Sequence, residues 1–402
     1  MNERVPSLRP ARRIAALAGI AVTMFALASC APPDPGTSAP VVKPEESAHE
    51  FAADESAAGF DLDALIAAAK KEGPITIYDQ TGKVVKIAET FAAKYGIDAT
   101  GVKLETNVIE KMRTEGRSGN VIGDVLASQE VGGVYSLIED GILTSWVPGD
   151  MFDKIPESAR YPFLNLYETY AWTYNSAVFP EGCPVDNVWQ LTEPEWKGRV
   201  SLMDPEKFAT TPIGWNQSAR DHAQKFAAAY EDRYGEALKT DESDAVHEWI
   251  KRLAQNSPVV GKDAEAPSDA VGGTGQPDSA ISLLPGAKYR NNADKDYAQA
   301  ACVGLQPYAG WTVPQSMTYA SKTKSPNAAK LYIHFATSQE GMDFVMGDAK
   351  SSYNPDVVPA EDPYELLALG RSGELQPYSV EYLDDDFQKV SDWLDFWRSS
   401  RR

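Results

Sequence analysis

The stretch that decides the fold is residues 74–96, PITIYDQTGKVVKIAETFAAKYG. Its first part has Ile75 and Ile77 on one face, which predicts a strand over residues 74–79. Residues 82–96 have apolar side chains at helical spacing and end at a glycine, which predicts an amphipathic helix. A strand that leads through a short polar turn into such a helix is the repeating unit of a parallel α/β sheet.

The same pattern extends on both sides of this stretch. The expected strands cover residues 101–107 and 123–128, and the expected helices cover residues 61–73, 108–115 and 129–141. Strands that alternate with amphipathic helices predict an α/β fold, with a parallel sheet and helices on both of its faces. In such sheets, ligands bind beyond the carboxyl ends of the strands.

Short polar clusters follow the three expected strands. They are Asp79, Gln80, Thr81, Gly82 and Lys83 after the first, Thr106 and Asn107 after the second, and Ser128 and Gln129 after the third. We expect these residues to line a ligand-binding cleft, where the amides at a helix start, together with Lys83, attract an anion. Ser, Thr, Asn and Asp are also the usual N-caps of helices, so a capping role is the alternative.

Four segments carry a resemblance to a known protein family. They are LIAAAKKEGPITIYD at residues 65–79, AWTYNS at 171–176, PEWKGRVSLMDP at 194–205 and SPNAAKLYIHFATSQEGMDFV at 325–345. In this order they resemble the extracytoplasmic solute-binding proteins of ABC importers, which have the type 2 periplasmic binding protein fold. The resemblance is to the group that includes ferric-iron-binding and hexose-phosphate-binding members. EWKGRV with Asp-Pro a few residues later is the most specific of these motifs.

The resemblance implies a two-lobed Venus-flytrap fold, in which two doubly wound sheets are joined by crossing hinge strands and close on a small solute. The implied divisions are residues 59–175 for the first part of lobe 1, residues 176–305 for lobe 2, and residues 306–402 for the rest of lobe 1 with a C-terminal helical tail. The implied partners are a small-molecule ligand and the transmembrane subunits of an ABC permease. We expect a monomer without a cofactor. A lipoprotein that senses a ligand for a sensor kinase has the same fold and is the alternative.

Lobe 2 is expected to supply the second side of the cleft. The resemblance places residues 208–217 there, and a helix that starts in this segment would face the one at Thr81. The candidate ligand-binding residues are Thr210, Thr211, Trp215 and Asn216, together with Trp172 and Tyr174 of the crossover segment. Two opposed helix starts hold an anion, so a small organic anion or organophosphate-like solute is the first expectation.

Ferric iron is the second expectation. The family's iron binders use adjacent tyrosines of lobe 2, and the matching segment here is LLPGAKYRNN at residues 283–292. It supplies only Tyr289, and Lys288 before it would repel a cation. No histidine pair has the spacing of metal ligands, so no metal site is assigned. A polyamine-type organic cation is third, since carboxylates such as Asp79 and Glu105 could bind it.

The N-terminal residues predict export and a lipid anchor. A basic start and the uncharged apolar run of residues 14–28 identify residues 1–29 as a secretory signal peptide. The three residues Leu-Ala-Ser before Cys30 resemble the bacterial lipobox, after which the cysteine is lipidated; an ordinary signal peptide is the alternative. Residues 30–58 are rich in Pro, Ala, Ser and acids and are expected to form a disordered tether. We therefore expect an extracytoplasmic protein, lipid-anchored to the outer face of the cell membrane.

The other two cysteines, Cys183 and Cys302, lie in a chain expected in a compartment that permits disulfides. Pairing them would close a loop of about 120 residues and contribute roughly 4–5 kcal/mol in the chain-entropy model. Two free buried thiols or a pair of metal ligands are the alternatives.

The overall charge and the absence of catalytic motifs restrict the function. A formal net charge of -20 argues against nucleic acid or anionic lipid as a partner, so membrane contact is expected through the anchor alone. The sequence has no Gly-x-Ser-x-Gly elbow, no P-loop and no His-Glu-x-x-His motif, so no enzymatic activity is expected. The acidic run from Asp384 to Asp386 is interpreted as solvated surface.

Overall fold

The computed structural model describes residues 49–104, 107–273, 279–362 and 364–401. The chain divides into residues 1–48 and a compact unit of residues 49–402, and only the second is described here. The expected signal peptide, Cys30 and most of the expected tether lie outside the described residues. Within the described ranges, no helix has both the length and the apolar character needed to cross a membrane.

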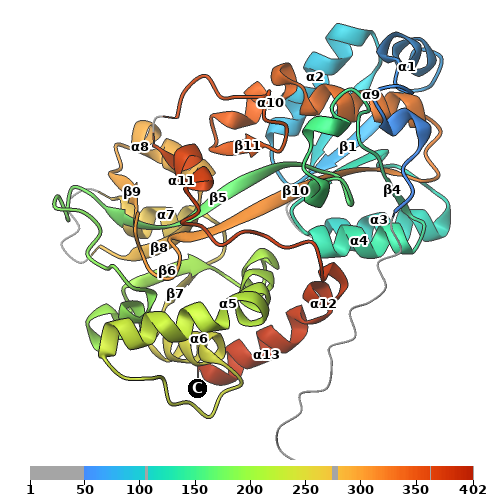
Figure 1. The fold of residues 1–402 in the computed structure, drawn as a ribbon. Coiled ribbons are helices and arrows are strands. Elements are labelled where there is room, and N and C mark those ends of the chain that lie inside the picture. Colours follow the sequence, from blue (N-terminus) through green and yellow to red (C-terminus); the bar gives the residue numbers. More distant parts are fainter. Residues whose placement is uncertain (1–48, 105–106, 274–278, 363, 402) are drawn as a thin grey trace, which may run out of the picture. The chain divides into compact units, whose positions relative to one another are not determined.

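Strands and helices alternate along most of the chain (Figure 1). The strands are β1 Ile75–Asp79, β2 Ala99–Lys103, β3 Val125–Ser128, β4 Leu143–Ser145, β5 Leu164–Asn175, β6 Val200–Met203, β7 Val259–Gly261, β8 Ile281–Pro285, β9 Gln299–Ala301, β10 Gly310–Ala320 and β11 Lys350–Ser352. The helices are α1 Leu62–Ala69, α2 Lys83–Tyr95, α3 Val108–Ser118, α4 Val131–Glu139, α5 Thr210–Tyr234, α6 Ala245–Gln255, α7 Glu265–Gly272, α8 Asn291–Asp294, α9 Pro326–Thr337, α10 Gln339–Met346, α11 Leu366–Ser372, α12 Leu383–Gln388 and α13 Val390–Ser400.

The strands form one hydrogen-bonded sheet in the order β2-β1-β3-β10-β5-β8-β6-β7. The long strands β5 and β10 pair antiparallel in its middle and run from one half of the sheet to the other (Figure 1). On one side of them β1 pairs parallel with β2 and β3, and on the other side β6 pairs parallel with β7 and β8. The structure therefore has the two parallel halves and the crossing strands that the sequence predicts, and these strands hydrogen-bond the halves into one sheet.

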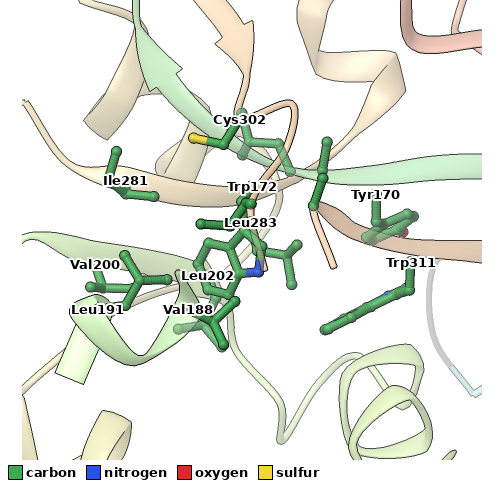
Figure 2. Packing of buried hydrophobic residues seen from close by; sticks show 14 of the residues in the cluster. Tyr170, Trp172, Val188, Leu191, Val200, Leu202, Ile281, Leu283, Cys302 and Trp311 are labelled. Atoms are coloured by element: carbon green, nitrogen blue, oxygen red, sulfur yellow. The ribbon is translucent and has the colours of Figure 1, made fainter. Parts of the chain in front are cut away.

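Each half of the sheet has its own hydrophobic core. The core that we call lobe 1 includes Ile77 of β1 and Phe91 of α2, and the residues of 74–96 fold as their periodicity predicts. The core that we call lobe 2 packs Trp172 of β5 against Trp249 of α6, with Leu202 and Leu283 nearby (Figure 2). Two separate cores joined through strands are the arrangement that permits one half to move relative to the other.

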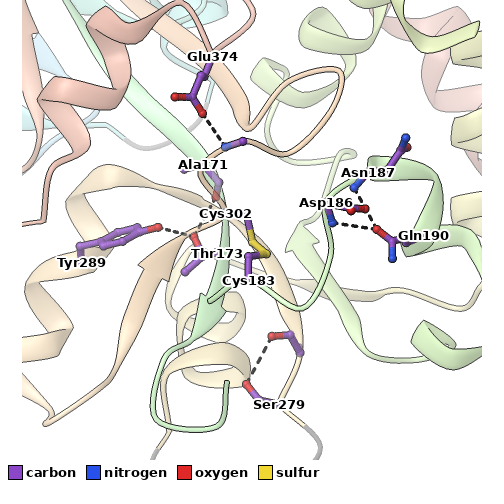
Figure 3. Close-up of a disulfide and its surroundings, with 12 residues drawn as sticks. Ala171, Thr173, Cys183, Asp186, Asn187, Gln190, Ser279, Tyr289, Cys302 and Glu374 are labelled. Carbon is purple, nitrogen blue, oxygen red and sulfur yellow. Dashed lines mark hydrogen bonds between the residues drawn. A yellow bond between two sulfur atoms is a disulfide. The ribbon is translucent and has the colours of Figure 1, made fainter. Parts of the chain in front are cut away.

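Cys183 and Cys302 form the expected disulfide bond (Figure 3). The bond lies in lobe 2 and ties the loop after β5 to the loop between β9 and β10. Glu374 fixes the same loop, because its carboxylate accepts a hydrogen bond of 2.6 Å from the amide of Gly304. The loop between β9 and β10, through which the chain leaves lobe 2, is thus held by the disulfide bond and by the side chain of Glu374.

The compact unit begins earlier than the expected tether allows. Residues 49–58 pack on lobe 1, where Phe51 contacts Phe152 edge-on and the carboxylate of Glu55 accepts a hydrogen bond of 2.9 Å from the amide of Val147. Glu55 is 4% exposed, and burial raises its pKa. The expected tether of residues 30–58 is therefore too long at its C-terminal end, because one aromatic and one acidic side chain in a polar segment anchor it to the core.

The C-terminal region also departs from the expected division into lobes. Residues 374–389, which we call the strap, lead away from lobe 2 and include α12. Helix α12 packs on α4 of lobe 1. Helix α13 then returns to α5 and α6, with Trp393 and Trp397 in the core of lobe 2 (Figure 1). The tail is a docked helix, as predicted, but it docks on lobe 2, and the strap before it touches both lobes.

Candidate functional site

The carboxyl ends of β1 and β3 meet in a half-buried polar network. Gln80 accepts hydrogen bonds at Oε1 from the amide of Gln129, at 2.8 Å, and from the hydroxyl of Ser128, at 3.5 Å. Its Nε2 donates to Glu130 at 3.1 Å, while Nε2 of Gln129 donates to Glu168 of β5 at 2.9 Å. The structure thus brings together the clusters expected after the first and third strands, and it adds two carboxylates that the sequence did not single out.

Asp79 lies at the centre of this network. Its Oδ1 accepts hydrogen bonds from the amide of Thr81, at 2.9 Å, and from Nε2 of Gln315 in β10, at 3.3 Å. The residue is 5% exposed, and burial raises its pKa to about 6 although the charge of Lys350 acts in the opposite direction. Lys350 itself is 5% exposed and lies opposite Glu168 in the pairing of β11 with β5. The site therefore combines buried carboxylates with a buried ammonium group.

The start of α2 is the more open part of the site. Gly82 is the N-cap of the helix, and the hydroxyl of Thr81 before it accepts a hydrogen bond of 3.2 Å from the amide of Lys83. The ammonium of Lys83 lies 3.9 Å from the carboxylate of Asp348, and the guanidinium of Arg290 donates to the same carboxylate at 3.0 Å. Lys83 and Asp348 belong to lobe 1, whereas Arg290 follows β8 in lobe 2. Two cations from opposite lobes therefore converge on one carboxylate.

The start of α5 faces lobe 1 across a small pocket. Thr210 hydrogen-bonds the side chain of Tyr170, whose pKa is raised by burial. Gln129 of lobe 1 and Thr210 of lobe 2 both line the pocket, as do Trp311 of β10 and Tyr378 of the strap. The structure therefore brings the candidate Gln129 together with the candidate Thr210, and β10 and the strap complete the walls.

Three other candidates from α5 do not face this pocket. Thr211, Trp215 and Asn216 are 3%, 2% and 8% exposed. The ring of Trp215 packs 5.2 Å from that of Trp397, and Nδ2 of Asn216 donates to Asp386 of the strap at 2.7 Å. In this structure Trp215 and Asn216 contact the C-terminal region, Thr211 is buried, and none of the three lines the pocket. The sequence does not indicate these contacts, because the partners of Trp215 and Asn216 lie far along the chain.

The remaining candidates are also placed away from the network. Trp172 is a core residue of lobe 2, and Tyr289 is 0% exposed with its hydroxyl 2.7 Å from that of Thr173 (Figure 3). Asn107 is exposed at the start of α3, whose N-terminus it does not cap with its side chain. Thr106 and Glu105 lie outside the described residues. Tyr174 lines a separate cavity of ≈ 490 Å³ beside Cys183 and Tyr364.

The residues that sequence reasoning missed come from distant segments. Glu168 and Trp311 belong to the crossing strands, Arg290 follows β8, and Asp348 and Lys350 flank a turn after α10. Only Arg290 had a sequence signal, since it lies in the segment matched to the iron binders. Among the described residues, no group of three or more His, Cys, Asp or Glu side chains could hold a metal ion.

Comparison with known proteins identifies the fold and the family. The structure is similar to iron-bound HitA from Pseudomonas aeruginosa, with a TM-score of 0.61 and 17% sequence identity over 82% of this chain and 99% of that one. It is also similar to the periplasmic binding protein AfuA from Actinobacillus pleuropneumoniae with fructose-6-phosphate bound, with a TM-score of 0.59 and 16% identity over 81% of this chain and 99% of that one.

A third similar structure is the substrate binding protein of an ABC transporter from Agrobacterium tumefaciens, with a TM-score of 0.62 and 16% identity over 84% of this chain and 97% of that one. At such identities the likeness concerns the fold, which is that of the two-lobed periplasmic binding proteins. No curated protein sequence matches the chain significantly. The family model described as bacterial extracellular solute-binding protein matches residues 86–365. The chain therefore belongs to the bacterial extracellular solute-binding protein family.

Proposed function

We propose that this solute-binding protein captures a small, hydroxyl-bearing organic anion between its two lobes and delivers it to an ABC permease. The observation that carries the proposal is the convergence of Lys83 and Arg290 on Asp348. In the absence of solute, the carboxylate of Asp348 neutralises both cations. A carboxylate or phosphate group of the solute takes its place between them and ties lobe 1 to lobe 2.

The start of α2 adds to the attraction for an anion. Its first amides donate to Thr81 and Gly82, so the helix end acts on an anion through its dipole. The aligned peptide dipoles give this end a partial positive charge, worth about 0.3–1 kcal/mol for a nearby anion. Lys83 is the first residue of the helix, and its side chain is 45% exposed. A guanidinium such as that of Arg290 binds carboxylate and phosphate through two parallel hydrogen bonds. The proposed anion site thus has a helix end and two cations.

The carboxylates of the network complement the rest of the solute. Asp79 and Glu168 accept hydrogen bonds, as does the amide oxygen of Gln80. Such acceptors suit hydroxyl groups, and their negative charge disfavours a second anionic group in the same place. We therefore propose a solute with one anionic end and a hydroxylated body, which is the organophosphate-like class.

Delivery and location follow from the family. Solute-binding proteins act outside the cytoplasm and pass small ligands to transmembrane subunits. We further propose that the lobes close by a hinge motion of β5 and β10, and that the mature chain is a monomer anchored through a lipid on Cys30. The last point is tested by metabolic labelling with palmitate, which we expect to label the wild type but not Cys30→Ser.

The ligand class is tested by calorimetric titration with a panel of phosphates, carboxylates, sugars, spermidine and Fe(III). We expect a phosphorylated or carboxylated solute to bind, and Lys83→Gln and Arg290→Gln each to weaken it about tenfold or more. Lys86→Gln is the matched control, because Lys86 lies on the same helix and pairs only locally with Glu89 at 3.3 Å. Equal affinity in Lys83→Gln, Arg290→Gln and Lys86→Gln would reject the anion site.

The same panel decides between the two alternative ligands. Iron would require an accessible tyrosinate, whereas burial raises the pKa of Tyr289 and Thr173 already pairs with its hydroxyl. A polyamine would bind through Asp79, Glu130 and Glu168, so it would lose affinity in carboxylate variants and gain it in Lys83→Gln. Binding of Fe(III) with a charge-transfer band that disappears in Tyr289→Phe would support the iron alternative.

A further inference from the structure

The pocket between the lobes has walls that carry no charge. It is lined by Gln129 of lobe 1, by Thr210 and Gly214 of α5, by Trp311 of β10 and by Tyr378 of the strap, with other uncharged neighbours. In this structure its space amounts to about one water molecule. A charged group placed there would lose its hydration without meeting an opposite charge, which is costly. The pocket is therefore chemically different from the proposed anion site at Lys83 and Arg290.

Two of the residues that line this pocket each have a buried polar atom without a partner in the described part of the chain. The indole Nε1 of Trp311 and the hydroxyl of Tyr378 are both buried, and neither makes a hydrogen bond within the described part of the chain. Trp311 is 8% exposed, and burial raises the pKa of Tyr378, so the phenol stays protonated. A buried donor without a partner costs about 1–3 kcal/mol. Two such groups on one pocket indicate that a polar atom from outside the chain completes it.

The chemistry of the two groups restricts what that atom can be. An indole N–H can only donate, so its partner must be an acceptor, which excludes an ammonium group. A phenol can donate or accept, so it complements either a hydroxyl or a carbonyl oxygen. The ring of Trp311 packs closely against Gly214, where an added Cβ would lie 3.2 Å from the ring. The indole donor, the phenol and the available space together fit one uncharged oxygen atom.

We propose that this pocket is a specificity subsite, in which Trp311 and Tyr378 bind one hydroxyl or carbonyl oxygen of the solute. This inference rests on the proposed function, since it concerns the uncharged part of the same ligand. It assigns Trp311 and Tyr378 a direct role in recognition. It also makes the strap, which lies beyond the residues matched by the family model, a part of the binding site.

The test compares inorganic phosphate, which has no carbon-bound hydroxyl, with glycerol 3-phosphate and hexose phosphates, each titrated by calorimetry. We expect Trp311→Phe and Tyr378→Phe each to lower the affinity for the hydroxylated phosphates about tenfold, because each leaves one hydrogen bond of the solute unmade. Inorganic phosphate should bind both variants as it binds the wild type. Lys83→Gln should instead weaken all the phosphates.

Two matched variants control for general effects of the substitutions. Nε1 of Trp397 is also buried without a partner but lies in the core with α13, so Trp397→Phe should leave all affinities unchanged. Tyr230→Phe serves likewise for the phenol, since Tyr230 lies near the other end of α5 and packs on Trp189. Thermal unfolding confirms that each variant is folded before it is titrated.

The outcomes separate this inference from the proposed function. If hydroxylated phosphates bind but Trp311→Phe and Tyr378→Phe retain wild-type affinity, a water molecule fills the pocket and the subsite is rejected, while the anion site stands. If only neutral polyols bind, and Trp311→Phe weakens them, the subsite stands and the anion site is rejected. Binding of no phosphate and no polyol overturns both.

Discussion

The N-termini of α2 and α5 have similar sequence patterns, but they differ in how far the rest of the chain covers them. Both were expected to face the solute as halves of an anion clamp. At α2, the first residue, Lys83, has a side chain that is 45% exposed. At α5, every residue from Thr211 to Ser218 is buried. The comparison teaches that a helix start becomes a binding site only where the rest of the chain leaves it uncovered.

The cover at α5 is provided by the strap. The carboxylate of Asp386 accepts hydrogen bonds of 2.7 Å from Asn216, Gln217 and Arg220, all on one stretch of α5. Gln376 of the strap accepts a further hydrogen bond of 2.7 Å from Ser218. These polar side chains of α5 therefore already have hydrogen-bond partners in the strap. The buried face of α5 thus packs mainly against the C-terminal region. The pocket is lined by Thr210, Ile213, Gly214 and Gln217 from the first two turns of the helix.

The largest expected effect comes from removing the strap's anchor on α5. Asp386→Ala should lower the free energy of unfolding by about 3–5 kcal/mol, because it removes a fully buried carboxylate that accepts hydrogen bonds from Arg220 and from two buried amide groups. Urea denaturation measures the loss. The control is Asp384→Ala on the same helix, an exposed residue for which we expect about 0.5 kcal/mol or less. Similar losses in both would mean that α5 is not covered in the way described.

The second expected effect concerns the buried carboxyl that precedes α2. The pKa of Asp79 is raised from 3.8 to about 6, so the folded state binds this proton more tightly than the unfolded state. Its contribution to stability is therefore greatest below pH ~4, falls as the pH rises to ~6 and is constant above, with a total change of roughly 3 kcal/mol. Asp79→Asn should remove this part of the pH dependence.

Unfolding free energies of the wild type and Asp79→Asn between pH ~4 and ~7.5 provide the measurement. Asp98→Asn, which changes an exposed carboxyl after α2, is the control and should keep the wild-type profile. If the unfolding free energies of Asp79→Asn and the wild type changed with pH in the same way, the pKa of Asp79 would not be raised by burial. The start of α2 would then lack the buried carboxyl group that distinguishes it from the start of α5.

A smaller effect is expected where the strap meets lobe 1. A Cβ at Gly132 of α4 would lie 2.7 Å from the carbonyl oxygen of Leu383, so Gly132→Ala should push α12 away and cost about 1–3 kcal/mol. Gly347→Ala is the matched control, because a Cβ there meets nothing within 4 Å. The difference between the two variants in thermal unfolding measures how firmly the strap is held on lobe 1.

The smallest expected effect separates the two helix starts directly. Thr81→Val removes the hydroxyl that accepts a hydrogen bond from the first amide of α2 and should cost about 1 kcal/mol of stability, with a several-fold loss of affinity for phosphorylated solutes. Thr211→Val at α5 should leave that affinity unchanged, since the residue is 3% exposed. Calorimetric titration decides, and an equal loss in both variants would restore the symmetrical clamp.

Local periodicity made part of this site predictable. Ile75 and Ile77 define a strand through nearest neighbours alone, and the ends of parallel strands meet at one edge of a sheet. That is why Gln80 and Gln129 were correctly expected to lie together, as their hydrogen bond confirms.

The rest of the site depends on contacts between distant segments. Asp386 looked like solvated surface in an acidic run, but it is 0% exposed because Arg220 pairs with it from 166 residues away. Arg290 and Asp348 meet across 58 residues and two lobes. No short pattern encodes such pairs, since each member alone has the sequence context of an ordinary surface charge.

The two ends of the described chain are fixed to different lobes. His49 stacks on Tyr161 of lobe 1 at 3.8 Å, whereas Trp397 lies in the core of lobe 2. A pair of fluorescent dyes on Glu50→Cys and Ser399→Cys, both exposed positions, would thus act as a molecular ruler across the hinge. Energy transfer between the dyes would then register each capture and release in a single molecule, without a label near the solute.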